Sequence, residues 1–295
     1  MKILVTGARG LLGSEIVPEA RRRGWEVVGL GRAELDVTDR PLVRERVLAE
    51  APDWVIHCAA YTAVDRAEDE PDVAMRVNRD GAANVARASA DTGASMVYVS
   101  TDYVFDGEKR TPYLPDDAVA PLSVYGRSKL AGEEVVRAVY AERSTAAADR
   151  RVVRPLIVRT GWLFGAGGRS FVLSILARAG KGGALRVVDD QRGRPTWTRS
   201  LAEAVLELIE RDVRGVWHVA NRGEATWLDL AREAVRIRGL DAQIDGVSSV
   251  EWGAPAERPT YSVLDLEGTE AALGREMIDW REALRRFLEA PGREE

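Results

Sequence analysis

The fold is decided near the start of the chain, in the stretch Lys2-Ile3-Leu4-Val5-Thr6-Gly7-Ala8-Arg9-Gly10-Leu11-Leu12-Gly13. The run Lys2–Thr6 has the apolar, β-branched composition of a fully buried strand. The glycines that follow permit a tight turn, close approach of the backbone to a bound phosphate, and close packing of a helix on the strand. The next helix, through about Arg23, then presents N–H groups and a positive dipole end. The spacing GxxGxxG at a first βα junction therefore predicts a nucleotide site.

Apolar β-rich runs and helical patterns alternate through the rest of the first half. Strands are predicted at Glu26–Leu30, Asp53–His57, Ser95–Ser100 and Leu156–Thr160, and helices at Pro41–Ala51, Pro71–Thr92 and Val124–Arg143. This alternation is typical of a parallel sheet built from βαβ units. We expect a Rossmann-type doubly wound α/β domain over residues 1–160, with a surface loop or helix end at Ala141–Arg154.

The second half alternates less regularly. Helices are expected near Ser170–Ala179, Ser200–Arg211, Trp227–Arg238 and Asp279–Leu288, strands near Leu185–Val188 and Val216–Ala220, and an irregular stretch around Glu251–Thr260. Residues 161–295 are predicted to form mainly a smaller α/β substrate-binding domain. Segments at about 184–220 are expected to return to the first domain.

Composition excludes several classes of protein. The 295 residues carry 42 Lys and Arg against 47 Asp and Glu, a net charge of −5, so no basic excess attracts nucleic acid or an anionic membrane. A single cysteine cannot form an internal disulfide or a Cys-rich zinc site. No stretch approaches the roughly 18 apolar residues of a membrane span. The start of the chain does not have the pattern of a signal peptide. We therefore expect a soluble cytoplasmic protein.

The end of the second predicted strand bears on the choice of cofactor. An acid there would bind the adenosine ribose, but the run Val27-Val28-Gly29-Leu30-Gly31-Arg32 contains none. Arg32 could instead bind a 2′-phosphate through a charge-assisted contact, or it could be a solvated surface arginine. The run favours NADPH over NADH.

A catalytic constellation follows the strand Ser95–Ser100. Thr101 lies at its carboxyl end, and Tyr125 and Lys129 lie four residues apart, on one face of the next helix. A neighbouring ammonium is expected to lower the pKa of the tyrosine and make it a general acid/base. The Thr101 hydroxyl can hydrogen-bond a substrate carbonyl.

Motifs spread over almost the whole chain resemble those of the extended short-chain dehydrogenase/reductases, and more narrowly of the dTDP-4-dehydrorhamnose reductases. They include Ser100-Thr101-Asp102-Tyr103-Val104-Phe105-Asp106-Gly107, Ser123-Val124-Tyr125-Gly126, Ser128-Lys129-Leu130-Ala131-Gly132-Glu133, Val77-Asn78, Arg159-Thr160-Gly161-Trp162 and Arg258-Pro259.

The resemblance implies roles for individual residues. It implies that Gly10, Leu11 and Leu12 contact the pyrophosphate. It also implies that Asp36 and Val37 lie beside the adenine and that Ala59, Ala60 and Tyr61 line the cofactor groove. It implies that Thr101, Asp102 and Trp162 contact the sugar and that Lys129 also holds the nicotinamide ribose. Tyr261, where the family pattern has Asn, and Arg194 depart from it in the substrate half.

Some residues are ambiguous by sequence. Glu15 lies where some members of the family have a Mg²⁺ ligand, but one carboxylate does not make a metal site. It is more simply an acid at a helix N-terminus. Trp217, Trp227 and Trp280 occur in periodic patterns and are predicted to be core residues.

The resemblance implies NADPH-dependent reduction of the 4-keto group of dTDP-4-dehydro-L-rhamnose, by an enzyme that is expected to be a homodimer. Alternatives remain open: a reductase or epimerase of another nucleotide-linked 4-keto-6-deoxysugar, a 4,6-dehydratase, or a non-catalytic NADP-binding regulatory subunit. The presence of Thr101, Tyr125 and Lys129 argues against the last. A dehydratase would normally have an acid pair after the strand-end hydroxyl, where Asp102 is followed by Tyr103.

Overall fold

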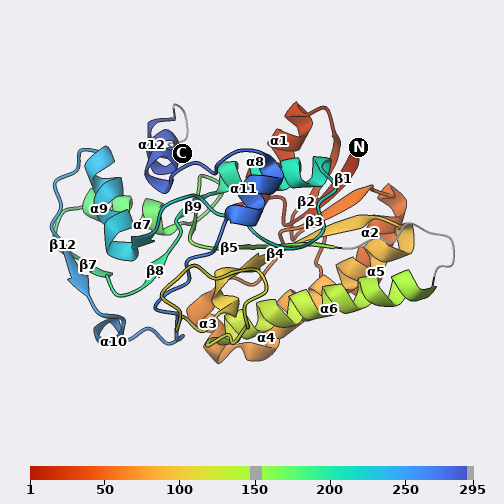
Figure 1. Cartoon of the computed structure of the whole chain (residues 1–295), viewed down its shortest axis with the longest axis horizontal. Coiled ribbons are helices and arrows are strands. Elements are labelled where there is room, and N and C mark those ends of the chain that lie inside the picture. Colours follow the sequence, from red (N-terminus) through yellow and green to blue (C-terminus); the bar gives the residue numbers. More distant parts are fainter. Residues whose placement is uncertain (147–154, 291–295) are drawn as a thin grey trace.

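The computed structural model describes residues 1–146 and 155–290, and Figure 1 shows that the chain forms two lobes side by side. The larger lobe contains a six-stranded sheet with helices on both faces. The smaller contains the helices α7 (Phe171–Ala179), α9 (Trp227–Ile237) and α12 (Trp280–Glu289). Of the segment Ala141–Arg154, residues 147–154 lie outside the described residues.

The sheet has the strand order β10-β5-β4-β3-β1-β2, and every neighbouring pair is parallel. The strands are β1 (Lys2–Thr6), β2 (Glu26–Leu30), β3 (Trp54–His57), β4 (Ser95–Thr101), β5 (Leu156–Thr160) and β10 (Gly215–His218). After β2 the chain returns to the other side of β1. Ligands of open α/β sheets bind at such a reversal, beyond the carboxyl ends of the strands. Here the reversal lies between β1 and β3.

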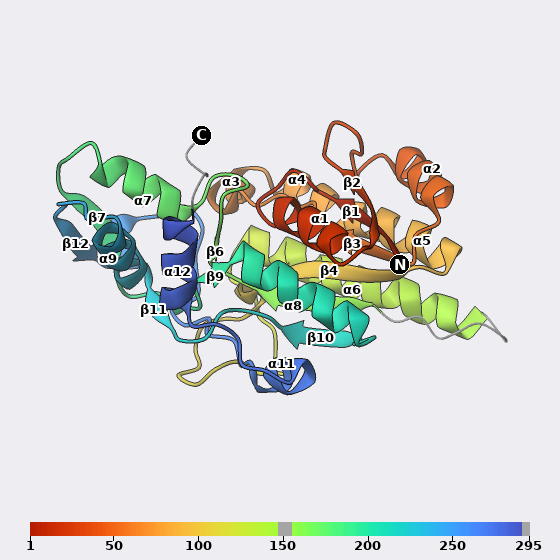
Figure 2. The same cartoon turned by 90° about the horizontal axis from the view of Figure 1, so that it is seen from above.

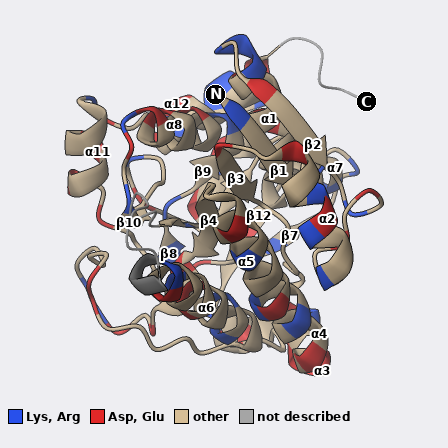
Figure 3. Cartoon of the chain, turned by 90° about the vertical axis from the view of Figure 1, so that its right-hand side faces the viewer, with Lys and Arg blue, Asp and Glu red and all other residues tan. Residues whose placement is uncertain are grey.

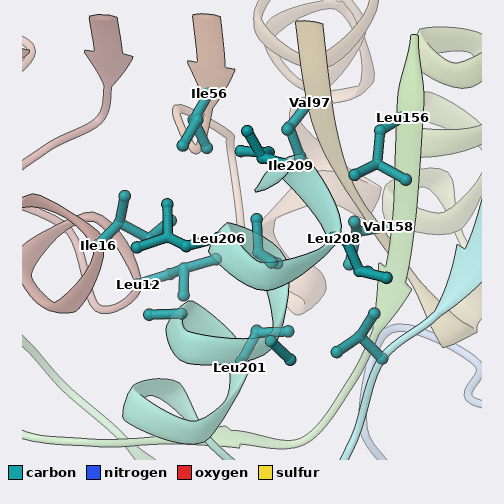
Figure 4. Close-up of a cluster of buried hydrophobic side chains, with 14 of the residues drawn as sticks. Leu12, Ile16, Ile56, Val97, Leu156, Val158, Leu201, Leu206, Leu208 and Ile209 are labelled. Carbon is teal, nitrogen blue, oxygen red and sulfur yellow. The ribbon is translucent and has the colours of Figure 1, made fainter. Parts of the chain in front are cut away.

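The two faces of the sheet bury alternate residues. Ile3 and Val5 point to the face covered by α1 (Gly13–Arg22) and α8 (Thr198–Glu210), which lie side by side in Figure 2. Figure 4 shows Leu12 and Ile16 meeting leucines of α8 there. Leu4 points to the opposite face, covered by the helices α2 (Arg40–Glu50), α5 (Ala82–Thr92) and α6 (Val124–Ala146). A doubly wound α/β sheet is therefore confirmed. Each fully buried aliphatic side chain contributes roughly 1.5–3 kcal/mol.

The predicted helix Pro71–Thr92 is confirmed as one continuous helical segment, but its hydrogen-bond pattern changes in the middle. It divides into α4 (Pro71–Met75), a π-helical turn η1 (Arg76–Gly81) and α5. A preceding helix, α3 (Val64–Asp69), was not predicted. A π-turn accommodates one extra residue per turn and is frequent at functional sites. Here it contains Asn78, whose amide binds the loop after β3, as described below.

In the smaller lobe, β7 (Leu185–Val188) pairs in parallel with β12 (Ile244–Val247). The segment 184–220 divides between the lobes, because β7 belongs to this small sheet, whereas α8 packs on α1 and β10 joins the large sheet. Several short elements were not predicted: β6 (Leu163–Phe164), β8 (Arg192–Gly193), β9 (Thr196–Trp197), β11 (Ala225–Thr226), α10 (Ser249–Trp252) and α11 (Glu267–Leu273).

Polar contacts join the lobes near the carboxyl ends of the strands. Arg258 forms a bidentate ion pair with Asp65 of α3, at 2.9 and 3.0 Å. The Ser262 hydroxyl donates to Asp102 Oδ2 at 2.6 Å. These contacts bring the segment after α10 against the edge of the sheet where the strands have their carboxyl ends.

Acidic and basic residues are interspersed over helices α2 and α6 in Figure 3. None of the helices in the described part of the chain is long and apolar enough to cross a membrane.

Candidate active site

The glycine loop lies against the loop that follows β3. Gly7 has φ +65°, and a Cβ there would lie 2.6 Å from the Ala59 nitrogen. A Cβ on Gly13 would overlap the Gly7 carbonyl, and the Gly10 N–H donates to that same carbonyl at 2.9 Å. The N-cap of α1 is Leu12, whose side chain cannot accept a hydrogen bond, so the helix can offer N–H groups to an anion. This cradle fits a dinucleotide pyrophosphate.

The end of β2 carries a carboxylate as well as the arginine noted in the sequence. Arg32 is exposed there, as a phosphate ligand would be. Glu34, however, accepts the Gly31 N–H at 2.7 Å and pairs with Arg9 from the glycine loop. The backbone bond from Gly31 and the guanidinium of Arg9 lower the pKa of the Glu34 carboxyl. Two guanidinium groups and one carboxylate therefore lie at and after the end of β2, where the sequence predicts contacts with a dinucleotide.

Asp36 and Val37 have structural partners of their own. Asp36 accepts hydrogen bonds from the N–H and hydroxyl of Thr38, which lower the pKa of its carboxyl. The Val37 side chain is buried, and its carbonyl accepts the Asn84 amide at 3.1 Å. Both residues are thereby held in a fixed turn between β2 and α2.

Asn78 fixes the loop that contains Ala59, Ala60 and Tyr61. Its Oδ1 accepts the Tyr61 N–H at 2.8 Å, and its Nδ2 donates to the Tyr61 carbonyl at 3.0 Å and to Ser128 Oγ at 2.9 Å. The buried Asn78 amide therefore links the loop after β3 to helix α6 through hydrogen bonds. No role for Asn78 could be predicted from local sequence, because these partners are 17 and 50 residues away.

Thr101 and Asp102 lie together where β4 ends. Thr101 Oγ1 donates to Asp102 Oδ1 at 3.1 Å and accepts the Tyr103 N–H at the same distance. Burial raises the pKa of the Asp102 carboxyl to about 7, although hydrogen bonds from Ser262 and Thr101 oppose the rise. Ser262 approaches from the other lobe and was missed as a site residue by sequence.

Tyr125 occupies the first turn of α6. That turn is capped by Glu68, which accepts the Val124 N–H at 2.8 Å, and by Ser123, which accepts the Gly126 N–H at 3.1 Å. Burial raises the pKa of the Tyr125 phenol to about 12, while a hydrogen bond with Thr101 lowers it. Lys129 was expected to lower this pKa, and that expectation is wrong, because desolvation of the phenol is the largest effect and raises its pKa.

Lys129 is buried, and its Nζ lies 4.1 Å from the centre of the Tyr98 ring. Burial lowers the pKa of its ammonium to about 7, and the carboxylate of Glu133, one turn later, raises it. Glu133 is fully buried and forms a bidentate pair with Arg159, at 2.9 and 2.8 Å. The structure thus brings Thr101 and Tyr125 into contact and places Lys129 one turn along the same helix.

Trp162 follows Gly161, whose backbone packs on Asp102: a Cβ on Gly161 would overlap the Asp102 carboxyl. Trp162 itself has φ +52°, a left-handed backbone conformation that costs a non-glycine residue on the order of 1 kcal/mol. Its side chain is 8% exposed.

A cavity of about 660 Å³ lies in the smaller lobe. Its lining includes the aromatic residues Phe171, Trp227 and Trp252 and the cationic residues Arg178, Arg186 and Arg258. This combination suits a ligand with an aromatic ring and negative charge. Arg258 also hydrogen-bonds Tyr103, which follows Asp102, and Trp227 stacks on Trp162, so these two lining residues link the cavity to the side chains after β4 and β5.

Glu15 is buried near the start of α1. Among residues 1–146 and 155–290, no group of three or more His, Cys, Asp and Glu side chains could hold a metal ion.

Comparison with known proteins assigns the family. Residues 1–292 match the family described as RmlD substrate binding domain. The chain is 42% identical over 287 residues to the dTDP-4-dehydrorhamnose reductase of Streptomyces griseus, covering 95% of this chain and 91% of the relative.

Solved structures agree. A dTDP-4-dehydrorhamnose reductase from Clostridium acetobutylicum superposes with a TM-score of 0.90 at 37% identity, covering 98% of this chain and 99% of the other. The Bacillus anthracis enzyme, solved in complex with NADP, gives 0.89 at 35% identity, covering 97% and 98%.

Proposed function

The chain belongs to the RmlD substrate binding domain family, and from this premise we propose that it reduces dTDP-4-dehydro-L-rhamnose to dTDP-L-rhamnose with NADPH. It is an oxidoreductase of nucleotide-sugar biosynthesis. The observation that carries the proposal is the meeting of the Thr101 and Tyr125 hydroxyls at the end of β4, next to the glycine cradle.

The reacting carbonyl lies between these two hydroxyls. The Thr101 hydroxyl would turn its hydrogen from Asp102 Oδ1 to the C4 oxygen and so orient the sugar. Tyr125 transfers its phenolic proton to that oxygen as negative charge develops on it. A phenol with a pKa of about 12 is fully protonated at neutral pH, which is the form that this step needs. Lys129, whose pKa is near 7, helps return a proton to Tyr125 between turnovers.

The cradle formed by Gly7, Gly10, Leu11, Leu12 and Gly13 would hold the pyrophosphate of NADPH. Asp36, Val37, Ala59, Ala60 and Tyr61 would line the groove, and Lys129 would also bind the nicotinamide ribose. When bound, the reduced nicotinamide supplies the hydride that C4 receives. Arg32 would bind the 2′-phosphate.

The sugar would contact Asp102 and Trp162. The dTDP part would extend into the cavity in the smaller lobe, where aromatic side chains can stack on thymine and arginines can neutralise the diphosphate.

The test follows loss of reduced-nicotinamide absorbance with dTDP-4-dehydro-L-rhamnose, with NADPH and NADH in parallel. Rapid oxidation that yields dTDP-L-rhamnose supports the proposal. Binding of NADPH without turnover would contradict it and favour the regulatory-subunit alternative. If the protein turns over only another 4-keto sugar nucleotide, the reductase assignment stands and that compound replaces dTDP-4-dehydro-L-rhamnose as the substrate.

Arg32→Ala tests the cofactor assignment. We expect the KM for NADPH to rise by roughly tenfold, because a charge-assisted contact is lost, while the KM for NADH stays unchanged. An equal rise for both cofactors would contradict the role of Arg32.

We also propose that the enzyme acts in the cytoplasm as a homodimer. The cytoplasmic location is supported by the single cysteine, which suits a reducing compartment. The homodimer is supported by the fact that two-fold dimers are the commonest oligomers. Light scattering coupled to size exclusion measures the mass, and a monomer at working concentration would contradict the dimer.

A further inference from the structure

Trp227 was predicted to be an ordinary core residue, but the structure places it between the cavity and the active site. Its ring lies flat on the ring of Trp162, with centroids 3.6 Å apart and planes within 2°. Trp227 also lines the cavity, whereas Trp162 directly follows Gly161, whose backbone packs on the Asp102 carboxyl. The pair therefore connects the wall of the cavity to the carboxyl end of β4.

Trp227 is itself firmly held. It is the first residue of α9, whose N-terminus has a capping box in which Thr226 and Asp229 exchange hydrogen bonds at 2.9 and 3.0 Å. Its Nε1 donates to Oε1 of the buried Gln191 at 3.1 Å. The Phe171 ring tilts against it at 4.7 Å. Backbone, hydrogen bond and packing together fix the plane of the Trp227 ring.

Trp162, in contrast, depends on its neighbours. Its backbone is left-handed, and its Nε1 is buried without a hydrogen-bond partner among the described residues. A Cβ on Gly193 would overlap its indole, so glycine there makes room for the ring on one side. The stacked face of Trp227 then defines where the indole lies.

We propose that Trp227 is a positioning residue, which acts on the reaction by holding the Trp162 indole against the sugar. This inference rests on the proposed function and deepens it. Misplacement of a substrate-orienting group by about 1 Å can cost on the order of 100-fold in rate, so a ring that fixes Trp162 affects turnover without touching the reacting atoms.

A double-mutant cycle tests the inference. Trp227→Ala is expected to lower kcat/KM for dTDP-4-dehydro-L-rhamnose by roughly 10- to 100-fold. The loss should fall mainly on kcat, and NADPH affinity should stay unchanged. If Trp227 acts through Trp162, the same change in a Trp162→Ala background costs little more. Trp227→Phe, which keeps an aromatic face, should recover most of the rate. Additive losses, or wild-type activity in Trp227→Ala, would overturn the inference.

Circular dichroism gives a readout that is independent of activity. Two indoles stacked in this way couple their transitions, and the resulting couplet should vanish in both Trp227→Phe and Trp162→Phe. Trp217→Phe, on β10, is the matched control and should keep it. A couplet that survives in Trp227→Phe would show that the pair is not stacked and overturn the inference.

Two results separate the possible failures. If Trp227→Ala does not fold, Gln191→Leu removes the hydrogen bond to the indole and is expected to lower kcat in the same direction; unchanged kcat there overturns the inference. If wild-type protein does not reduce the substrate, the proposed function fails and this inference fails with it. If wild-type protein reduces the substrate and the Trp227 and Gln191 variants are equally active, the proposed function stands and only this inference fails.

Discussion

Burial raises the pKa of two acids in the site, that of Asp102 to about 7 and that of Tyr125 to about 12, so at neutral pH the carboxyl is partly protonated and the phenol keeps its proton. Their neighbours modify this effect: Ser262 and Thr101 donate to the carboxyl, and Thr101 also bonds the phenol. Thr101 therefore connects the two groups. At the residue scale, the site is arranged to donate hydrogen bonds and a proton to a substrate oxygen, as reduction of a ketone requires.

Tyr125→Phe removes the proposed proton donor and little else. We expect kcat to fall by roughly 10²–10⁴-fold, the usual contribution of general acid catalysis. The dissociation constant for NADPH, measured by fluorescence titration, should stay nearly unchanged. Equal loss of turnover and NADPH binding in a folded variant would refute this role for Tyr125.

The raised pKa of Asp102 predicts a pH dependence of stability. Between about pH 4 and pH 7 the folded protein keeps a proton that the unfolded chain has released, so stability from this group falls as pH rises. The slope is roughly 1.4 kcal/mol per pH unit. His57 and His218, with pKa values lowered to about 3 by burial, act in the opposite sense.

Asp102→Asn keeps both histidines, so the difference between the two proteins isolates the carboxyl. Urea unfolding at a series of pH values should show the stability of wild type relative to Asp102→Asn falling from pH 4 to 7. A difference that is flat, or that rises, would contradict the raised pKa.

At the scale of elements, α6 carries Tyr125 and Lys129, and its distance from β4 decides where they lie. Gly126 and Gly132 permit a close approach: a Cβ on Gly126 would overlap the Tyr103 carbonyl, and one on Gly132 the Tyr98 hydroxyl. Asn78 adds a hydrogen bond from the π-turn to Ser128 of the same helix. The catalytic helix is therefore placed by backbone contact and one buried amide.

Gly132→Ala tests this close approach. Because the tyrosine and the backbone at the site cannot move aside cheaply, we expect a loss of about 3 kcal/mol in unfolding free energy and a fall in kcat. Gly180→Ala is a matched control at a helix end, with φ −66° and ordinary contact at 3.5 Å. It should leave both quantities unchanged. A harmless Gly132→Ala would show that α6 has room to shift.

At the scale of the whole molecule, the site is complete only when the lobes meet. Ser262 and Arg258 come from the smaller lobe and bind Asp102 and Asp65 of the larger one. Arg258 also lines the cavity. Contacts between the lobes therefore set the position of the sugar nucleotide relative to the cofactor groove.

Asp65→Ala removes the carboxylate that orients Arg258. Since Asp65 is about half exposed, the cost in stability should be about 1 kcal/mol or less. The KM for the sugar nucleotide should nevertheless rise several-fold, while NADPH binding, which depends on the glycine loop, stays the same. Asp80→Ala, which breaks an exposed pair with Arg79, is the control. The same change in KM for both variants would argue against an orienting role.

Local patterns in the sequence determined the large sheet and most of its helices. The strands β1 and β2 and the glycine loop have the predicted bounds because buried parallel strands are continuous apolar runs, and because only glycine tolerates the contacts at Gly7 and Gly13. The pairing of Thr101 with Tyr125 could also be anticipated, since a strand end and a helix start converge at one edge of a parallel sheet.

Only the tertiary structure decided the rest. The pKa of Tyr125 depends on burial, which no spacing reveals, and the stack of Trp162 on Trp227 joins residues 65 positions apart in sequence. The pairs Ser262–Asp102 and Arg258–Asp65 span 160 and 193 residues. Such contacts arise when two lobes pack, and their geometry depends on every element between them, whereas a strand or a glycine turn is specified by its own few residues.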